Sequence, residues 1–92
     1  MTTKMAYRIF FEAEAETQFH SLEGGVREKI SKKLEQLQRG DMQSRHLKHG
    51  IPVFVEEVGQ YRIVFKTRDD LKQKRVVFVG DHKHYEKWYR GR

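Results

Sequence analysis

Apolar and polar positions change period along this chain, and each period predicts an element. Residues 5–11 alternate, with Met5, Tyr7, Ile9 and Phe11 on one side, which is typical of a strand. From Glu12 onward the apolar spacing becomes helical. Ala15, Phe19 and Leu22 fall at i, i+4 and i+7, which predicts one helix face. The pair Gly24-Gly25 is predicted to end this helix.

A second helix is predicted after the glycine pair. Val26, Ile30, Leu34 and Leu37 form its apolar stripe, and Gly40 closes it. The two helices together are expected to form an α-hairpin that covers one face of a sheet. The positions on the other side of the second helix, expected to face water, are Arg27, Glu28, Lys32, Lys33 and Glu35.

Residues 53–58 and 61–66 predict a β-hairpin around Gly59-Gln60, a two-residue turn of type II′. In that register Val58 pairs with Tyr61 and Glu57 with Arg62. The alternate positions Tyr61, Ile63 and Phe65 are expected to face the helices. Glu56 then also faces the helices, which a bulge or a longer loop would relieve.

Residues 74–79 predict the last strand, and 81–89 a short helix or irregular tail. Residues 40–52 are interpreted as a loop in which Leu47 anchors to the core and Pro52 starts the next strand. The fold class is therefore α+β, with the order strand-helix-helix-strand-strand-strand and a short C-terminal helix or tail. We expect one domain over residues 1–92, with an antiparallel sheet packed on the α-hairpin. The first strand pairs with the last or lies at an edge.

The net charge of +6 is unevenly distributed. Residues 1–40 hold seven Lys/Arg and six Asp/Glu, a net of +1, whereas residues 41–92 hold twelve and seven, a net of +5. Acidic or phosphate-bearing partners are therefore expected to meet the second half, unless the charge serves only solubility. The chain has no cysteine, no apolar run long enough to span a membrane and no signal-peptide pattern. A reducing cytoplasm is the expected compartment.

The second half also holds the parts for metal-free RNA cleavage. Arg62 can bind phosphate through two parallel hydrogen bonds, and His82 and His84 can transfer protons. Tyr85 is a further catalytic candidate. The basic and aromatic residues expected to bind RNA, through phosphate contacts and base stacking, are Arg45, His46, Lys48, Lys66, Lys83, Trp88 and Tyr89.

Each of these residues also has a structural interpretation. Arg62 can form a cross-strand ion pair with Glu57. His82 and His84 can be ordinary surface residues, and Trp88 fits core packing at helical spacing. The pairs His46/His49 and His82/His84 lack cysteines and a fixed ligand spacing, so a metal site is disfavoured and no cofactor is expected.

Three segments resemble the RelE/ParE superfamily of bacterial toxins. They are HLKHG at 46–50, EEVGQYRIVFKTRDD at 56–70 and KRVVFVGDHKHYEKWY at 74–89. With the predicted element order, the resemblance covers nearly the whole chain. It implies a small toxin that an antitoxin neutralises and that usually cleaves mRNA on the ribosome.

The resemblance also assigns roles by position. Arg62 matches the phosphate-contacting arginine of the family's central strand, and His82 matches a catalytic arginine or histidine position. Lys48 matches a basic loop position, and Tyr85, Trp88 or Tyr89 matches a C-terminal aromatic residue. Two departures stand out. The RelE branch has lysines on the strand before the hairpin, where this chain has Val53, Val55, Glu56 and Glu57. The YoeB-like branch has a glutamate base where this chain has Arg45, so either His82, His84 or Glu57 serves as base or the mechanism is weaker.

Three functions remain open from the sequence. The leading one is a ribosome-dependent mRNA endoribonuclease that inhibits translation. Its partners would be a cognate antitoxin, mRNA and the ribosome, with a homodimer or a toxin–antitoxin hetero-oligomer as the assembly and no membrane contact. The second is a gyrase inhibitor of the ParE branch, which needs no catalytic histidine. The third is an inactive RNA- or protein-binding module, which the missing strand lysines favour.

Overall fold

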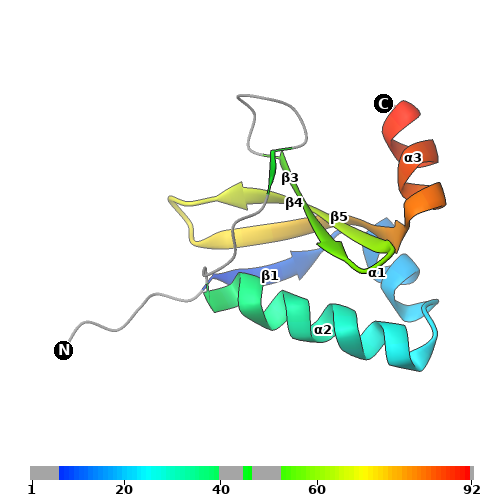
Figure 1. The fold of residues 1–92 in the computed structure, drawn as a ribbon. Coiled ribbons are helices and arrows are strands. Elements are labelled where there is room, and N and C mark those ends of the chain that lie inside the picture. Colours follow the sequence, from blue (N-terminus) through cyan, green and yellow to red (C-terminus); the bar gives the residue numbers. More distant parts are fainter. Residues whose placement is uncertain (1–6, 40–44, 47–52, 92) are drawn as a thin grey trace.

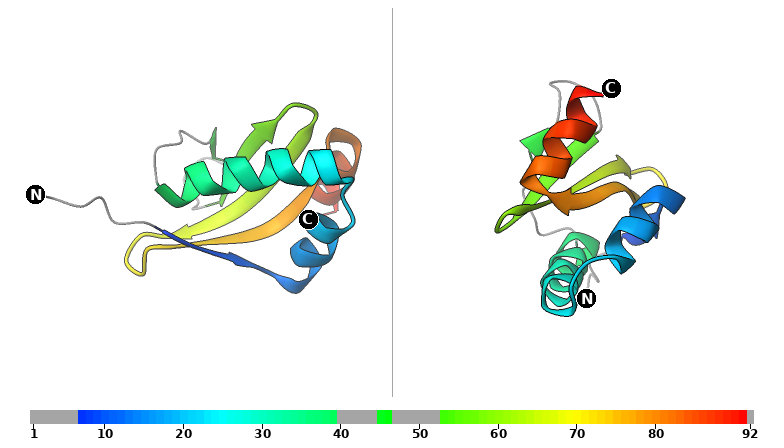
Figure 2. Two further views of the ribbon diagram at one scale, coloured as in Figure 1. Left: turned by 90° about the horizontal axis from the view of Figure 1, so that it is seen from below. Right: turned by 90° about the vertical axis from the view of Figure 1, so that its right-hand side faces the viewer.

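A five-stranded sheet in the order β1-β5-β4-β3-β2 forms the centre of the protein. The computed structural model describes residues 7–39, 45–46 and 53–91. The strands are β1 (Arg8–Phe11), β2 (Arg45–His46), β3 (Val53–Val58), β4 (Tyr61–Arg68) and β5 (Gln73–Asp81). The helices are α1 (Ala13–His20), α2 (Gly24–Arg39) and α3 (His82–Arg90). Helices α1 and α2 cover one face of the sheet, and α3 stands on the other side (Figures 1 and 2).

The topology confirms the predicted fold class. Strands β3, β4 and β5 are consecutive and antiparallel, and β1 lies at the sheet edge beside β5, the last strand. The β1–β5 pair is parallel, because the two helices between them carry the chain back to the other end of the sheet. The sheet is therefore mixed at one edge and antiparallel elsewhere. The C-terminal tail is the helix α3.

The predicted loop at 40–52 needs one correction. Arg45 and His46 form the short strand β2, which pairs antiparallel with β3. The edge of β3 would otherwise expose unpaired backbone groups, and this pairing satisfies part of it. The predicted helix end at Gly40, the core anchor Leu47 and the strand start at Pro52 lie outside the described residues, as do Met5 and Ala6 of the predicted first strand.

The hairpin register is the predicted one. Val58 pairs with Tyr61 and Glu57 with Arg62. Gly59 has φ +59°, and Gln60 is not among the residues with positive φ, as a type II′ turn requires. Neither a bulge nor a longer loop relieves Glu56, because β3 pairs with β4 without a shift from Val53 to Val58. The sheet is irregular instead between β4 and β5, where the register shifts between Val64 and Phe65.

The glycine pair Gly24-Gly25 was predicted to end the first helix. In the structure it lies at the start of α2 instead. Helix α1 ends at His20, where the Ser21 N–H caps its last carbonyls. Glu23 then accepts a hydrogen bond from the Gly25 N–H at 2.9 Å, which satisfies a free donor in the first turn of α2. A glycine pair marks a helix boundary without indicating on which side of it the helix lies.

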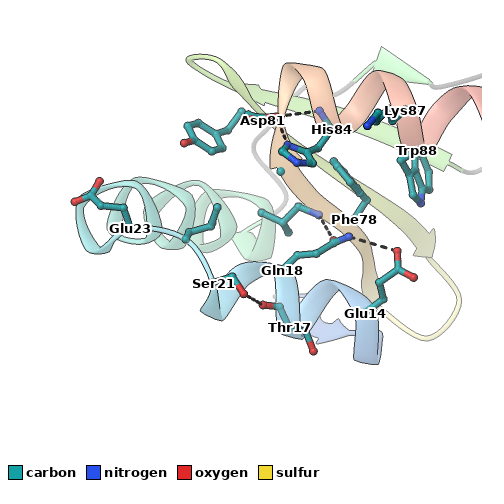
Figure 3. Close-up of a pocket in the computed structure, with 14 residues that line it drawn as sticks. Glu14, Thr17, Gln18, Ser21, Glu23, Phe78, Asp81, His84, Lys87 and Trp88 are labelled. Atoms are coloured by element: carbon teal, nitrogen blue, oxygen red, sulfur yellow. Dashed lines mark hydrogen bonds and ion pairs between the residues drawn. The ribbon is translucent and has the colours of Figure 1, made fainter.

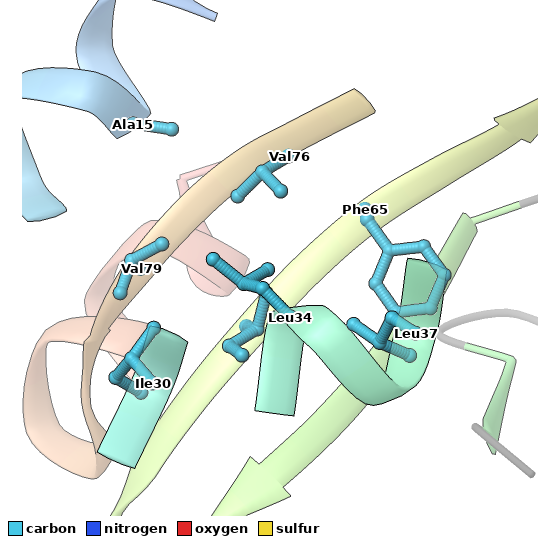
Figure 4. Packing of buried hydrophobic residues seen from close by; sticks show 8 residues of the cluster. Ala15, Ile30, Leu34, Leu37, Phe65, Val76 and Val79 are labelled. Carbon is cyan, nitrogen blue, oxygen red and sulfur yellow. The ribbon is translucent and has the colours of Figure 1, made fainter. Parts of the chain in front are cut away.

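The main core lies between the helices and the sheet (Figure 4). Helix α2 contributes the predicted stripe of Ile30, Leu34 and Leu37, all buried. Burial of each such side chain stabilises the fold by about 1.5–3 kcal/mol. The residues that meet the stripe from α1 and the sheet are Ala15, Ile63, Phe65, Val76 and Val79.

Glu56 is accommodated by an ion pair. Its side chain is 10% exposed, and its Oε1 atom lies 3.8 Å from Nζ of Lys33. Lys33 was predicted to face water, yet only 23% of its side chain is exposed. Helix α2 therefore presents a cation to the one carboxylate that the β3 register turns inward, and this explains why no bulge is needed.

We predict that Lys33→Ala lowers the free energy of unfolding by about 1–2 kcal/mol, because a nearly buried carboxylate loses its cation. Lys32→Ala is the matched control. Lys32 pairs with Glu28 at 3.7 Å on the same helix, but both side chains are more than 70% exposed. That change should cost less than about 0.5 kcal/mol. Urea denaturation measures both, and equal losses would contradict the assigned role of Lys33.

Candidate functional site

Asp81 fixes the junction between β5 and α3. Its Oδ1 atom accepts a hydrogen bond from the His84 backbone N–H at 2.9 Å and lies 2.7 Å from His84 Nδ1. The backbone and then the side-chain hydrogen bond from His84 hold the pKa of Asp81 below its usual value. The His82 N–H donates to the Gln60 carbonyl at 2.8 Å. The start of α3 is therefore tied to the β3–β4 turn.

The two candidate histidines have different partners. Both lie in the first turn of α3, where residues two apart are rotated by about 200°. His84 bends back to Asp81, whereas Nε2 of His82 lies 3.2 Å from Oε2 of Glu86, one turn onward. The two rings therefore point to different sides of the helix. Both rings are accessible, with 54% of the His82 side chain and 74% of the His84 side chain exposed.

Arg62 lies beside this junction, directly across from Gly80 in the β4–β5 ladder. Its Nη1 atom donates to the carbonyls of Gly59 at 3.2 Å and Tyr61 at 3.0 Å. Its Nε atom lies 3.9 Å from Glu57 Oε2, which confirms the alternative of a cross-strand pair. Only 15% of the side chain is exposed. The turn thus holds the guanidinium in place while Glu57 occupies the position beside it.

Aromatic rings fill the space between α3 and the sheet. The Trp88 and Phe78 rings are 5.3 Å apart, and the Tyr85 ring lies 6.2 Å from Phe78. Val55, Val64 and Val77 are the other buried residues of this second cluster. The prediction that Trp88 packs in a core is confirmed. Tyr89 stacks on Tyr85 at 6.1 Å and remains 40% exposed, so it is the ring of this group best able to meet a partner.

A cleft of about 660 Å³ separates α1 from α3 (Figure 3). Gln18 bridges its floor, since its Oε1 accepts from the Val79 N–H at 2.9 Å and its amide donates to Glu14 at 3.3 Å. His84 and Lys87 face it from α3. This cleft could not be predicted from the sequence, because its lining residues come from two helices, two strands and the α1–α2 connection, far apart in the chain.

Lys66 lies on the face of β4 that points away from α1 and α2. A hollow of about 310 Å³ opens beside it, lined by Glu12, Lys66, Thr67, Arg68, Gln73 and Arg75. Lys66 pairs directly with Arg75 across the β4–β5 ladder. Arg75 was missed as a candidate. Its position at the partner site of Lys66 depends on the register shift in the ladder, which the sequence did not reveal.

The structure thus places the predicted site residues that it describes in three regions. Arg62, His82, His84 and Tyr85 gather where β4, β5 and α3 meet, and Lys83 is exposed in the first turn of α3. Lys66 lies four residues farther along β4, at a distance of about 13 Å. Arg45 and His46 are on β2, at the edge of the sheet. Lys48 lies outside the described residues.

Among the described residues, no group of three or more His, Asp or Glu side chains is arranged to hold a metal ion. None of the helices that the structure describes is long and apolar enough to cross a membrane.

The described residues define a small α+β protein in which Arg62 of β4 lies across from Gly80 of β5, two residues before His82 at the start of α3. Several solved toxin structures share this arrangement of elements. The chain is similar to the toxin in the intact Escherichia coli RelBE toxin–antitoxin complex, with 26% identity and a TM-score of 0.71 over 83% of this chain and 96% of that one. No family model matches the chain, and no curated protein sequence matches it significantly.

Two further solved structures are also similar to the chain. The isolated E. coli RelE toxin gives 25% identity and a TM-score of 0.72, covering 92% of this chain and 98% of that one. The RelBE2 toxin–antitoxin complex of Mycobacterium tuberculosis gives 17% identity and a TM-score of 0.75, covering 88% and 97%. At that identity the likeness shows the fold alone. The chain has a RelE-like toxin fold.

We predict that Asp81→Ala lowers the free energy of unfolding by about 1 kcal/mol at pH 7, because α3 loses its N-cap. Asp81→Asn should cost less, since an amide oxygen can still accept the His84 N–H. The folded-state pKa of Asp81 is below its ordinary value of 3.8. Its charge therefore stabilises the fold fully above that pH and less as the pH falls below it.

The difference between wild type and Asp81→Ala should accordingly shrink on acidification from pH 7 to pH 3. Denaturation curves at the two pH values measure it. A difference that grows in acid would mean that the carboxylate does not stabilise this junction.

Proposed function

We propose that this protein is the toxin of a type II toxin–antitoxin pair and that it cleaves mRNA on the ribosome without a metal ion. The observation that carries the proposal is the match to RelE toxins over 83–92% of this chain at 25–26% identity. We infer a cytoplasmic protein that a cognate antitoxin neutralises in a hetero-oligomer, or that forms a homodimer when free. Several of the similar solved structures are toxin–antitoxin complexes.

Arg62 is the residue that we assign to the phosphate. Two turn carbonyls already fix one of its guanidinium nitrogens. The other nitrogens can make the paired hydrogen bonds that suit a phosphate and stabilise the charge of a phosphorane. Glu57, 3.9 Å from Nε, competes for the same group and must be displaced by the RNA. A preformed cation of this kind costs little reorganisation when the substrate binds.

His82 is the residue that we assign to proton transfer. Its ring is accessible, and the Glu86 carboxylate 3.2 Å from Nε2 holds it in orientation. Arg62 lies opposite Gly80, two residues from His82, so a phosphate bound by the arginine is close to the imidazole. His84 serves a different purpose in this proposal, because its backbone and ring both engage Asp81 at the helix start.

The side chains around this pair supply binding. Tyr89 is the exposed ring, and Lys83 is an exposed cation in the first turn of α3. Tyr85 lies in the stack between Trp88 and Tyr89 and is partly buried, so we assign it to holding Tyr89 in place. Trp88 supports α3 on the sheet.

Induced expression without a partner tests the proposal. Growth should stop, and incorporation of labelled methionine should fall before incorporation of labelled thymidine, because mRNA is the target. Early loss of thymidine incorporation with intact mRNA would indicate gyrase inhibition instead. Normal growth at confirmed soluble expression would indicate an inactive module. Either result would overturn the proposal.

His82→Gln and His84→Gln are matched variants for an assay of mRNA cleavage, since both remove one imidazole from the first turn of α3. His82→Gln should slow mRNA cleavage roughly 100-fold, the scale of one positioned acid or base. His84→Gln should change it by less than about threefold, because Asp81 still caps the helix through the backbone N–H. The reverse order would move the assignment from His82 to His84.

A further inference from the structure

A row of three side chains crosses the sheet on the side away from α1 and α2. Phe10 of β1 pairs with Arg75 of β5, and Arg75 pairs with Lys66 of β4. The neighbours of Phe10 in β1, Ile9 and Phe11, pack against the core under the helices, so Phe10 points the other way. With neighbouring strands about 4.8 Å apart, the row spans about 10 Å.

The charges in this row are not compensated. Lys66 and Arg75 face each other directly, an arrangement that destabilises a sheet when nothing offsets it. Among the described residues, neither has a carboxylate within ion-pairing distance. Arg68 differs, because Asp70 binds it through two hydrogen bonds of 2.9 and 3.1 Å. Glu12 lines the same hollow and is its one carboxylate among the lining residues.

Phe10 adds an aromatic surface to the two cations. Its side chain is 39% exposed, one of three large hydrophobic residues so exposed among those described. An exposed ring next to uncompensated cations on a sheet face suits single-stranded nucleic acid, because the ring stacks on an unpaired base while the cations bind the backbone. An acidic peptide would use the cations and gain little from the ring.

We propose that Phe10, Arg75 and Lys66 form a nucleotide subsite for single-stranded RNA, apart from the proposed cleavage site. Phe10 stacks on a base, and the two cations bind a backbone phosphate. The subsite rests on the proposed function only in taking RNA as the ligand. Lys66 lies about 13 Å along β4 from Arg62, too far for one phosphate to contact both. Helix α3 rises from the other end of the sheet and leaves this part open (Figure 1).

Binding of a labelled, unstructured RNA oligonucleotide to the full chain tests the subsite by fluorescence anisotropy across a range of salt concentrations. The double variant Lys66→Gln/Arg75→Gln should bind at least about tenfold more weakly at low salt. Its salt slope should be smaller by about 1.4, from two lost phosphate contacts at about 0.7 each. Its melting temperature should not fall, because the facing like charges are gone.

Phe10→Leu separates stacking from charge. It should weaken binding about 5-fold or more, the lower range for one stacked base, and leave the salt slope unchanged. Phe10→Trp should restore binding. Arg68→Gln is the matched control, since Asp70 already neutralises that cation in the same hollow, and it should bind as wild type does. Glu12→Gln should strengthen binding by removing a charge that repels phosphate.

Equal RNA binding by wild type and the double variant would overturn the subsite. Full competition by an oligoglutamate peptide, equally strong for wild type and Phe10→Leu, would overturn it too. These outcomes are distinct from failure of the nuclease assignment. If the binding pattern holds but no mRNA is cleaved, the subsite stands and the nuclease proposal falls. If mRNA is cleaved and the variants bind RNA as wild type does, the subsite falls alone.

Discussion

The pairing of β4 with β5 is the interaction on which the rest of the structure depends. Alternation along the two strands sends Ile63 and Val79 toward α1 and α2, where they bury against the apolar stripe of α2. It sends Val64 and Phe78 to the opposite face, where they receive the rings of α3. The register shift after Val64 allows both clusters to form, because the extra residue keeps the apolar side chains of β5 on the correct faces beyond it.

The face of the β4–β5 ladder that points away from α1 and α2 is covered by α3 at one end only. One candidate site lies at this covered end, and the other lies on the part that α3 does not cover. Helix α3 covers one end, and its cap at Asp81 starts the helix next to Gly80, the residue that pairs with Arg62. The other end carries Lys66 and Arg75 without a covering helix. A single-stranded RNA can therefore run from the strand–helix junction along the open sheet. The absence of lysines at Val53 and Val55 makes Arg62 and these cations the principal positive groups of the described face.

Much of the fold could be predicted because the signals are local. The Gly59-Gln60 turn fixed the hairpin register, and the spacing of Ile30, Leu34 and Leu37 fixed the buried side of α2. The site depended on contacts that a sequence does not display. Whether His82 and His84 share a side is decided by α3 being helical, and the sequence left this segment open between a short helix and an irregular tail. Phe10 meets Arg75 across 65 positions through a parallel pair.

We propose that the junction of β4, β5 and α3 cleaves mRNA on the ribosome. The most direct test adds the purified protein to a reconstituted translation system with end-labelled mRNA, with and without ribosomes, and compares wild type with Arg62→Ala. We expect discrete cleavage only with ribosomes present, and a loss of at least about 100-fold for Arg62→Ala, the scale for one electrostatic group in a transition state. Intact mRNA at protein concentrations that stop translation, or equal cleavage by Arg62→Ala, would contradict it.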